Sequence, residues 1–160
     1  MRDKQEVAAE ALGEAFDRLH SPGYWSNLLA RRFFVRLSHQ LQQMGLCAGQ
    51  FGPLVWLWER DGRTQAELCR CLSVDQSTMA RTLTRMERDG LIRREPDPED
   101  RRRALVHLTD KARDLEERAL DVAHNVNREA FFGLSREEAE LFFRLARRMI
   151  ANLNNLEAEP

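Results

Sequence analysis

The chain of 160 residues has only three cysteines and one tyrosine, and it lacks any long hydrophobic run. No apolar stretch approaches the roughly 20 residues that a membrane-spanning helix needs, and residues 1–20 lack the apolar centre of a signal peptide. Cys47, Cys69 and Cys71 are too few and too irregularly spaced for a secreted disulfide framework. We therefore expect a cytoplasmic protein without a membrane partner, built as one domain with helical extensions.

Patterns that indicate catalysis or metal binding are also missing. His20, His39, His107 and His124 show no close metal-ligand spacing with a cysteine. The sequence has no glycine-rich phosphate loop and no nucleophile motif. We therefore expect no enzymatic activity, no catalytic residue, no bound metal and no cofactor.

An excess of positive charge is absent as well, since 25 basic and 26 acidic residues give a net charge of −1. Basic and acidic residues number 7 and 7 in residues 1–62, 10 and 8 in residues 63–105, and 8 and 11 in residues 106–160. Only the central segment is positive, by two charges. Charge alone therefore gives no indication of nucleic-acid binding, and the motifs must decide.

Apolar residues recur at helical spacing through most of the chain, which predicts a mainly α-helical protein. Residues 1–22 are expected to form an N-terminal extension helix that ends at the break Ser21-Pro22-Gly23, with a disordered arm as the alternative. A second helix is expected over residues 24–44. A third, over residues 48–60, is almost continuously apolar and should be buried on most sides.

The C-terminal third is expected to contain two further helices. A long helix begins at Thr109 or Asp110, and Ser135 with Glu138 forms a capping box for the last one. The apolar stripe of the last helix is wider than one neighbouring helix can cover. Its members are Leu141, Phe142, Leu145, Ala146, Met149, Ile150, Leu153 and Leu156.

The centre of the chain predicts a helix-turn-helix. Thr64 and Glu67 form a capping box for a short helix over residues 64–71. After a tight turn, Asp75 can cap a second helix that runs to residue 89.

A β-hairpin is expected next. Residues 91–95 and 104–108 have the composition of strands, and the intervening residues 96–103 are polar and contain two prolines. The order helix, turn, helix, hairpin is that of a winged helix-turn-helix, whose second helix enters the major groove of DNA.

The second helix of this unit has one apolar and one polar side. Met79, Leu83 and Met86 should pack on the first helix, and the polar side lies roughly 115° away. Arginine can read guanine, glutamine can read adenine, and hydroxyl groups can hold phosphate. For this helix alone, an ordinary solvated face remains the alternative. The predicted base-edge contacts are Gln76, Ser77, Thr78, Arg81 and Arg85, and the predicted phosphate contacts are Thr64, Gln65 and Thr82.

The hairpin carries a more specific pattern, the signature Asp-x-Arg-(x)5-Leu-Thr. It is matched by Asp100, Arg102, Leu108 and Thr109. On this signature and the preceding helices, the sequence resembles the MarR family over residues 24–156, most densely over residues 64–109. The resemblance implies a DNA-binding transcriptional regulator, with a winged helix-turn-helix set in a helical dimerisation frame.

The signature also has a physical interpretation. Asp100 lies close enough to Arg102 for a salt bridge, which would orient the arginine and reduce the entropy that it loses on binding. Arg102 would then enter the narrow minor groove of an A·T-rich segment. Arg101 and Arg103 flank it and could hold phosphates.

The family resemblance implies a division of the chain and a homodimer. Residues 23–47 and 110–156 would form dimerisation helices, and residues 48–109 the DNA-binding lobe. Two recognition helices about 34 Å apart would then read a pseudo-palindromic operator. Completion of a monomeric core by the terminal helices is the alternative.

The resemblance further implies a repressor that a small anionic or aromatic ligand releases from DNA. The candidate ligand-binding residues are Trp25, Arg31, Arg32 and His39, each of which could instead be a packing, interface or surface residue. Two other functions stay open: a thiol-based redox sensor that uses Cys47, Cys69 or Cys71, and a winged-helix module that binds protein rather than DNA.

Overall fold

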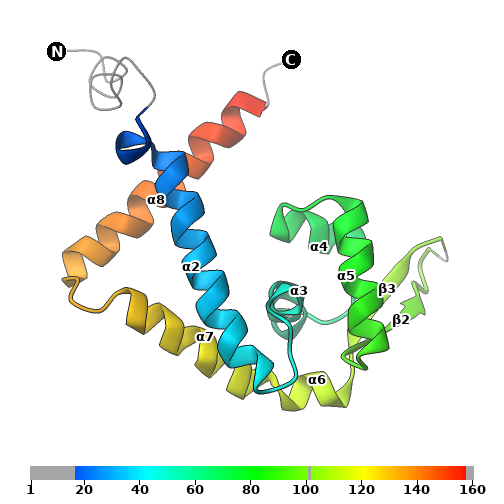
Figure 1. The fold of residues 1–160 in the computed structure, drawn as a ribbon. Coiled ribbons are helices and arrows are strands. Elements are labelled where there is room, and N and C mark those ends of the chain that lie inside the picture. The colour runs from blue at the N-terminus through cyan, green and yellow to red at the C-terminus, as the bar shows by residue number, and fades with distance from the viewer. Residues whose placement is uncertain (1–16, 101, 158–160) are drawn as a thin grey trace. The chain divides into compact units, whose positions relative to one another are not determined.

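The structure, a computed structural model, describes residues 17–100 and 102–157 (Figure 1). The chain divides into one compact unit that ends at Ala123 and a second that starts at His124. None of the described helices is long and apolar enough to cross a membrane. The elements are η1 Arg18–His20, α2 Pro22–Gln42, α3 Ala48–Glu59, β1 Arg63–Thr64, α4 Gln65–Leu72, α5 Gln76–Arg88, β2 Ile92–Pro96, β3 Ala104–Leu108, α6 Asp110–Asp114, α7 Glu116–Ala130 and α8 Arg136–Glu157. The predicted fold class, mainly α with a small β-hairpin wing, is confirmed.

Both helices of the predicted helix-turn-helix begin at the expected caps. Thr64 Oγ1 accepts the Glu67 N–H at 3.2 Å, and Glu67 Oε2 accepts the Thr64 N–H at 2.7 Å, which completes the capping box of α4. At the start of α5, Asp75 Oδ1 accepts the Thr78 N–H at 2.8 Å. These bonds satisfy amides that have no partner within the helix, and therefore fix where each helix starts.

The hydrophobic core lies in the first unit. The apolar side of α5, formed by Met79, Leu83 and Met86, is buried as expected, and α5 contacts both α4 and β2 (Figure 1). Neighbouring elements supply the other large side chains that are fully buried. Their packing against the apolar side of α5 leaves the opposite side of this helix exposed. These are Leu41, Leu46, Leu54, Leu57, Leu68, Leu91, Val106 and Leu108.

The sheet has three antiparallel strands in the order β1, β3, β2. The predicted hairpin is confirmed, with Arg94 opposite Val106 and Ile92 opposite Leu108. Strand β1 was not predicted, because a strand of two residues has no alternating pattern to detect. It places Thr64 opposite Leu105 and so attaches the start of α4 to the hairpin.

The prediction of a single long helix from Thr109 or Asp110 is wrong, since α6 ends at Asp114 and α7 begins at Glu116. Trp58 Nε1 donates to the carbonyl oxygen of Ala112 at 3.0 Å. In a continuous α-helix that oxygen would accept from the N–H of Glu116. At the point where the helix is interrupted, the indole N–H of Trp58 therefore occupies the Ala112 carbonyl oxygen in place of the Glu116 N–H.

The predicted N-terminal extension helix falls mostly on residues 1–16, which lie outside the described part of the chain. Residues Arg18–His20 form a short 3₁₀ turn, and α2 begins at Pro22, two residues earlier than expected. Ser21 Oγ accepts the Tyr24 N–H at 3.2 Å, and proline is well suited to the first helical position. The motif expected to break the helix instead starts α2.

The second unit contains the end of α7, a turn and α8. Gly133 adopts a positive φ of 84° in this turn, and the predicted capping box follows, with the Ser135 N–H donating to Glu138 Oε2 at 2.7 Å. Phe131 packs against Phe142 and Phe143, with ring centroids 5.4 and 5.5 Å away.

Candidate nucleic-acid interface

The outer side of α5 presents two arginines to solvent. Arg81 and Arg85 are exposed, and no ion pair to either is found among the described residues. They lie four residues apart, about one helical turn, so both guanidinium groups project from the same side of the helix. This is the arrangement expected of a helix that reads a major groove.

The hydroxyl groups of α5 are engaged within the helix. Ser77 Oγ and Thr78 Oγ1 donate to the carboxylate of Asp75 at 2.6 and 2.7 Å, and Thr82 Oγ1 donates to the Thr78 carbonyl at 3.0 Å. These oxygens can still accept a hydrogen bond, but their protons are already used. Among the predicted base-reading residues, the side chains with donors still free are therefore the longer ones, Gln76, Arg81 and Arg85.

Asp75 fixes the start of the recognition helix electrostatically. Hydrogen bonds from the Ser77 and Thr78 hydroxyls and from the Thr78 backbone N–H hold the pKa of this carboxyl well below its usual range. Asp75 is therefore ionised at neutral pH, and its charge lies at the positive end of the α5 dipole.

The starts of α4 and α5 are joined by a pair of glutamines. Gln65 Nε2 donates to Gln76 Oε1 at 2.9 Å and to the Gln76 carbonyl oxygen at 3.2 Å. This leaves Gln76 Nε2 able to donate to a base. The contact aligns a predicted phosphate residue with a predicted base-reading residue.

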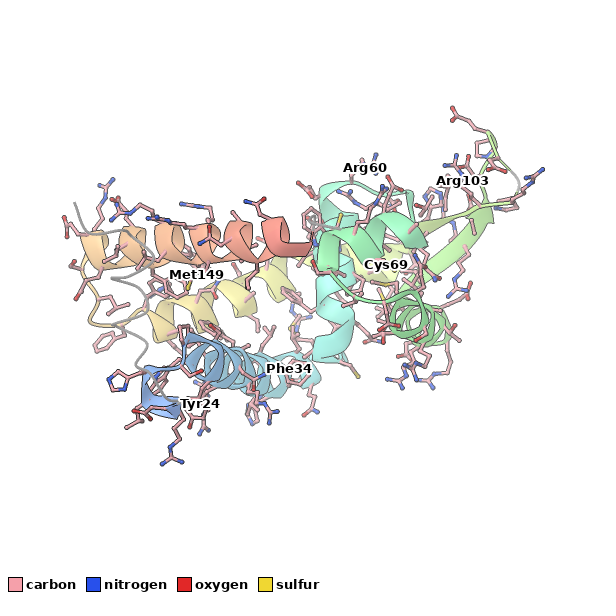
Figure 2. All side chains as sticks on the ribbon, turned by 90° about the horizontal axis from the view of Figure 1, so that it is seen from above. Tyr24, Phe34, Arg60, Cys69, Arg103 and Met149 are labelled. Atoms are coloured by element: carbon pink, nitrogen blue, oxygen red, sulfur yellow. The ribbon has the colours of Figure 1, made fainter. Side chains whose placement is uncertain are left out.

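A groove of about 760 Å³ lies between α4, the start of α5 and the hairpin. Thr64, Gln65, Gln76 and Arg103, all predicted contacts, line it together. Arg60 and Arg103, both labelled in Figure 2, also line it. The structure thus brings predicted residues from three elements to one surface.

Two arginines of this groove, Arg60 and Arg70, were not predicted. Arg60 pairs with Glu67, whereas Arg70 is exposed and no ion pair to it is found among the described residues. A signal for Arg70 was present in the sequence. Arg70 follows Ala66 by four residues and Leu68 by two. Helical periodicity therefore places it with Ala66 on the side of α4 opposite the buried Leu68.

The structure does not show the salt bridge that we expected between Asp100 and Arg102. Asp100 Oδ1 accepts the backbone N–H of Arg102 at 3.1 Å, while the side chain that faces Asp100 is Arg103, with Nε 3.6 Å from Oδ2. Asp100 uses one oxygen for the backbone of Arg102, whose side chain is exposed to solvent, whereas the side chain of Arg103 turns back toward Asp100. Arg101, a predicted phosphate contact, lies outside the described residues.

The four candidate ligand-binding residues lie on α2, and all four are exposed. Trp25 Nε1 donates to the Leu19 carbonyl oxygen at 2.9 Å, and its ring meets Tyr24 edge to face at 5.5 Å. Trp25, Arg32 and His39 follow at intervals of seven residues, so they share one side of the helix. None of the four lines the groove described above, and their role in ligand binding stays a prediction.

The three cysteines have different surroundings. Cys47 is exposed, and Cys69 is buried, which raises the pKa of its thiol and disfavours the reactive thiolate. Cys71 is half-buried, with its Sγ 4.0 Å from a guanidinium nitrogen of Arg63. Among the described residues no group of His, Cys, Asp and Glu side chains could hold a metal ion.

Comparisons with known proteins agree with this geometry. The sequence profile of the MarR family matches residues 46–104, which include the helix-turn-helix and most of the hairpin. The transcriptional regulator HosA of Escherichia coli O111:H- is 34% identical over 122 residues, which are 76% of this chain and 89% of HosA. Relatives of the chain are thus regulators of transcription rather than enzymes.

Solved structures show the same relationship. A crystal structure of MarR is 28% identical and superposes with a TM-score of 0.77, covering 92% of this chain and all of the other. A mutant of Escherichia coli MarR in complex with operator DNA is 25% identical, with a TM-score of 0.75, and covers 79% of this chain and 91% of the other. The fold, the helix-turn-helix with its wing and these likenesses together establish that the chain belongs to the MarR family of transcriptional regulators.

Proposed function

We propose that the protein is a sequence-specific repressor, which binds a pseudo-palindromic double-stranded operator as a homodimer and leaves it when a small anionic or aromatic ligand binds. As a regulator of transcription it would act in the cytoplasm, beside the genome. The observation that carries the proposal is the exposed pair Arg81 and Arg85 on a helix whose opposite side is buried.

The wing supports DNA rather than protein as the partner. Arg102 is exposed at the end of the hairpin, as a side chain that enters a minor groove must be. Arg60, Arg70 and Arg103 line the groove beside α4, and for Arg70, which is exposed, no ion pair is found among the described residues. Arginine at this density is typical of surfaces that contact phosphate, although the protein as a whole carries no net positive charge.

A homodimer would cover apolar surface that a single chain leaves exposed. On α2, Leu29, Phe34 and Val35 are exposed. Large apolar side chains that a single chain leaves exposed in such number would be covered by a partner chain. The α8 stripe adds Leu141, Phe142, Leu145, Met149, Ile150 and Leu153, all exposed; the side chain of Leu156 lies outside the described residues.

Repression and release follow from the same arrangement. A dimer that covers an operator blocks polymerase without needing a further contact. A ligand that binds beside α2 and favours another spacing of the two recognition helices would weaken DNA binding by linkage. The exposed Trp25, Arg32 and His39 on one side of α2 suit an anionic or aromatic ligand.

Footprinting on the intergenic DNA beside the protein's own gene tests the proposal. We expect one protected pseudo-palindrome, with half-sites about one helical turn apart. Affinity should fall linearly with the logarithm of the salt concentration. Equal binding to a scrambled duplex of the same length would contradict sequence-specific recognition, and absence of binding would favour the protein-contact module.

A further inference from the structure

We propose that Arg103 is a positioning residue that locks the wing loop so that Arg102 can reach the DNA, rather than a phosphate contact itself. The inference rests on the proposed function and assigns a specific part of it. We call Asp97, Asp100 and Arg103 together the wing latch. Figure 2 labels Arg103 on the hairpin, near the loop that joins its strands.

The carboxylate of Asp97 is the buried half of the latch. Its side chain is only 9% exposed, and Oδ2 lies 3.0 Å from a terminal nitrogen of Arg103. The other oxygen, Oδ1, accepts the Glu99 N–H at 2.9 Å. A carboxylate so far removed from water must be paired and hydrogen-bonded. Among the described residues, Arg103 is the cation found within ion-pair distance of it.

Arg103 also closes the loop at the backbone. The Asp97 N–H donates to the Arg103 carbonyl oxygen at 3.0 Å, and the Arg103 N–H donates to the Asp100 carbonyl oxygen at 2.9 Å. The guanidinium then reaches Asp100 with its Nε while its terminal nitrogen holds Asp97. Arg103 thus connects Asp97 with Asp100 and closes the loop that precedes β3.

The latch leaves Arg102 available and fixes its backbone. Asp100 Oδ1 accepts the Arg102 N–H at 3.1 Å, and the Arg102 side chain is exposed. A loop that is ordered before binding loses less entropy when its arginine enters a groove. By contrast, the Arg103 guanidinium lies within ion-pair distance of two carboxylates, which offset its charge and so weaken its attraction for a DNA phosphate.

The first test uses the protein without DNA. D97N keeps the shape of the side chain and an oxygen for the Glu99 N–H, but removes the charge that holds Arg103. D97N and R103A should speed hydrogen exchange of the Glu99, Arg102 and Arg103 amides about tenfold, the effect of losing one charge-assisted hydrogen bond. The control is E99Q, because the Glu99 side chain is exposed and outside the latch; it should leave these rates unchanged. Unchanged rates in D97N and R103A would overturn the latch.

The second test uses operator DNA, with the affinity measured over a range of salt concentrations. D97N makes the wing more positive, so charge alone predicts tighter binding, whereas the latch predicts binding about tenfold weaker. R103A and R103K should both weaken binding, since lysine cannot bridge two carboxylates. The slope of log K against log salt should stay unchanged in each variant.

The outcomes separate the latch from the function on which it rests. Tighter binding by D97N, wild-type binding by R103K, or a slope reduced by about 0.9 in R103A would make Arg103 a phosphate contact and overturn the proposal. A wild-type protein that shows no preference for any DNA would instead overturn the proposed function. In that case the exchange rates would still decide whether the latch orders the loop.

Discussion

Gln50 and Asp89, 39 residues apart in the sequence, are joined by a hydrogen bond of 2.7 Å from Nε2 to Oδ2. Gln50 lies buried in α3, and its Oε1 also accepts the Cys47 N–H at 3.0 Å. Asp89 ends the recognition helix, and its carbonyl oxygen accepts Lys111 Nζ at 2.7 Å. The end of α5 is therefore hydrogen-bonded to both α3 and α6.

Replacing Gln50 tests how much this contact stabilises the fold. Q50A should lower the free energy of unfolding by about 1–3 kcal/mol, because it removes two hydrogen bonds and leaves a small cavity beside the Cys47 amide. Urea denaturation measures the change. Q42A is the matched control, since Gln42 is exposed at the end of α2 and should change stability by less than about 0.5 kcal/mol. Equal effects of the two variants would contradict a role for the contact.

The capping box of α4 should make part of the stability depend on pH. The Thr64 N–H and hydroxyl and the guanidinium of Arg60 outweigh the effect of burial and lower the pKa of Glu67 to about 2. Since the folded pKa is depressed, this stabilisation is complete above the unfolded value near 4.5 and is lost as the pH falls toward 2. E67Q should cost about 1 kcal/mol at pH 7 and progressively less below pH 4.5. A difference in unfolding free energy that stays constant from pH 7 to pH 3 would refute this.

Replacing Arg81 tests whether the exposed side of α5 reads the major groove. R81A should weaken operator binding by about 1–3 kcal/mol and relax specificity at one base position in each half-site. Fluorescence anisotropy with single-substitution operators measures both effects. R118A, an exposed arginine of α7, serves as the control and should bind like the wild type. If R81A lost affinity equally for all sequences, Arg81 would be a phosphate contact.

Arg102 tests the minor-groove contact. R102A should weaken binding to an operator with A·T-rich flanks strongly and leave the fold intact, because the side chain is exposed. Replacing the flanks with G·C pairs should reduce wild-type affinity but change R102A little. Unchanged affinity of R102A in a gel shift would remove the wing from DNA recognition.

The α8 stripe tests the dimer. I150E should disrupt self-association, because burying an unpaired carboxylate in an apolar interface is costly; Ile150 is 58% exposed in the single chain. Light scattering at micromolar concentration should give a dimer for the wild type and a smaller mass for I150E. N152A, in the same helix, should remain dimeric. A monomeric wild-type protein would end the homodimer proposal.

Local signals in the sequence were sufficient for the recognition helix and its caps. Asp75 stands directly before a run in which Met79, Leu83 and Met86 recur at helical spacing, and each of these features acts within a few residues. The same holds for Thr64 and Glu67. These elements were predicted within a residue or two of their observed bounds.

Features that depend on distant residues could not be found in this way. The break between α6 and α7 coincides with a hydrogen bond from Trp58, more than 50 residues earlier. The pairing of Asp97 with Arg103 requires the loop geometry of the hairpin, whereas sequence spacing favoured Asp100 with Arg102. The two-residue strand β1 exists only because β3 offers it a partner. Where DNA and effector bind remains a prediction, since exposed side chains carry no packing signal.

Thr64 is at once the strand residue opposite Leu105 and the cap of α4. The hairpin and the first turn of α4 are consequently parts of one rigid piece. On an operator bound as proposed, with the wing in a minor groove, the protein would thus set the distance from that groove to the backbone beside α4. Inserting one base pair there would move the two sites apart by about 3.4 Å and rotate them about the DNA axis. The number of base pairs in each half-site of the operator should therefore be fixed. Binding should tolerate extra base pairs only at the centre of the palindrome.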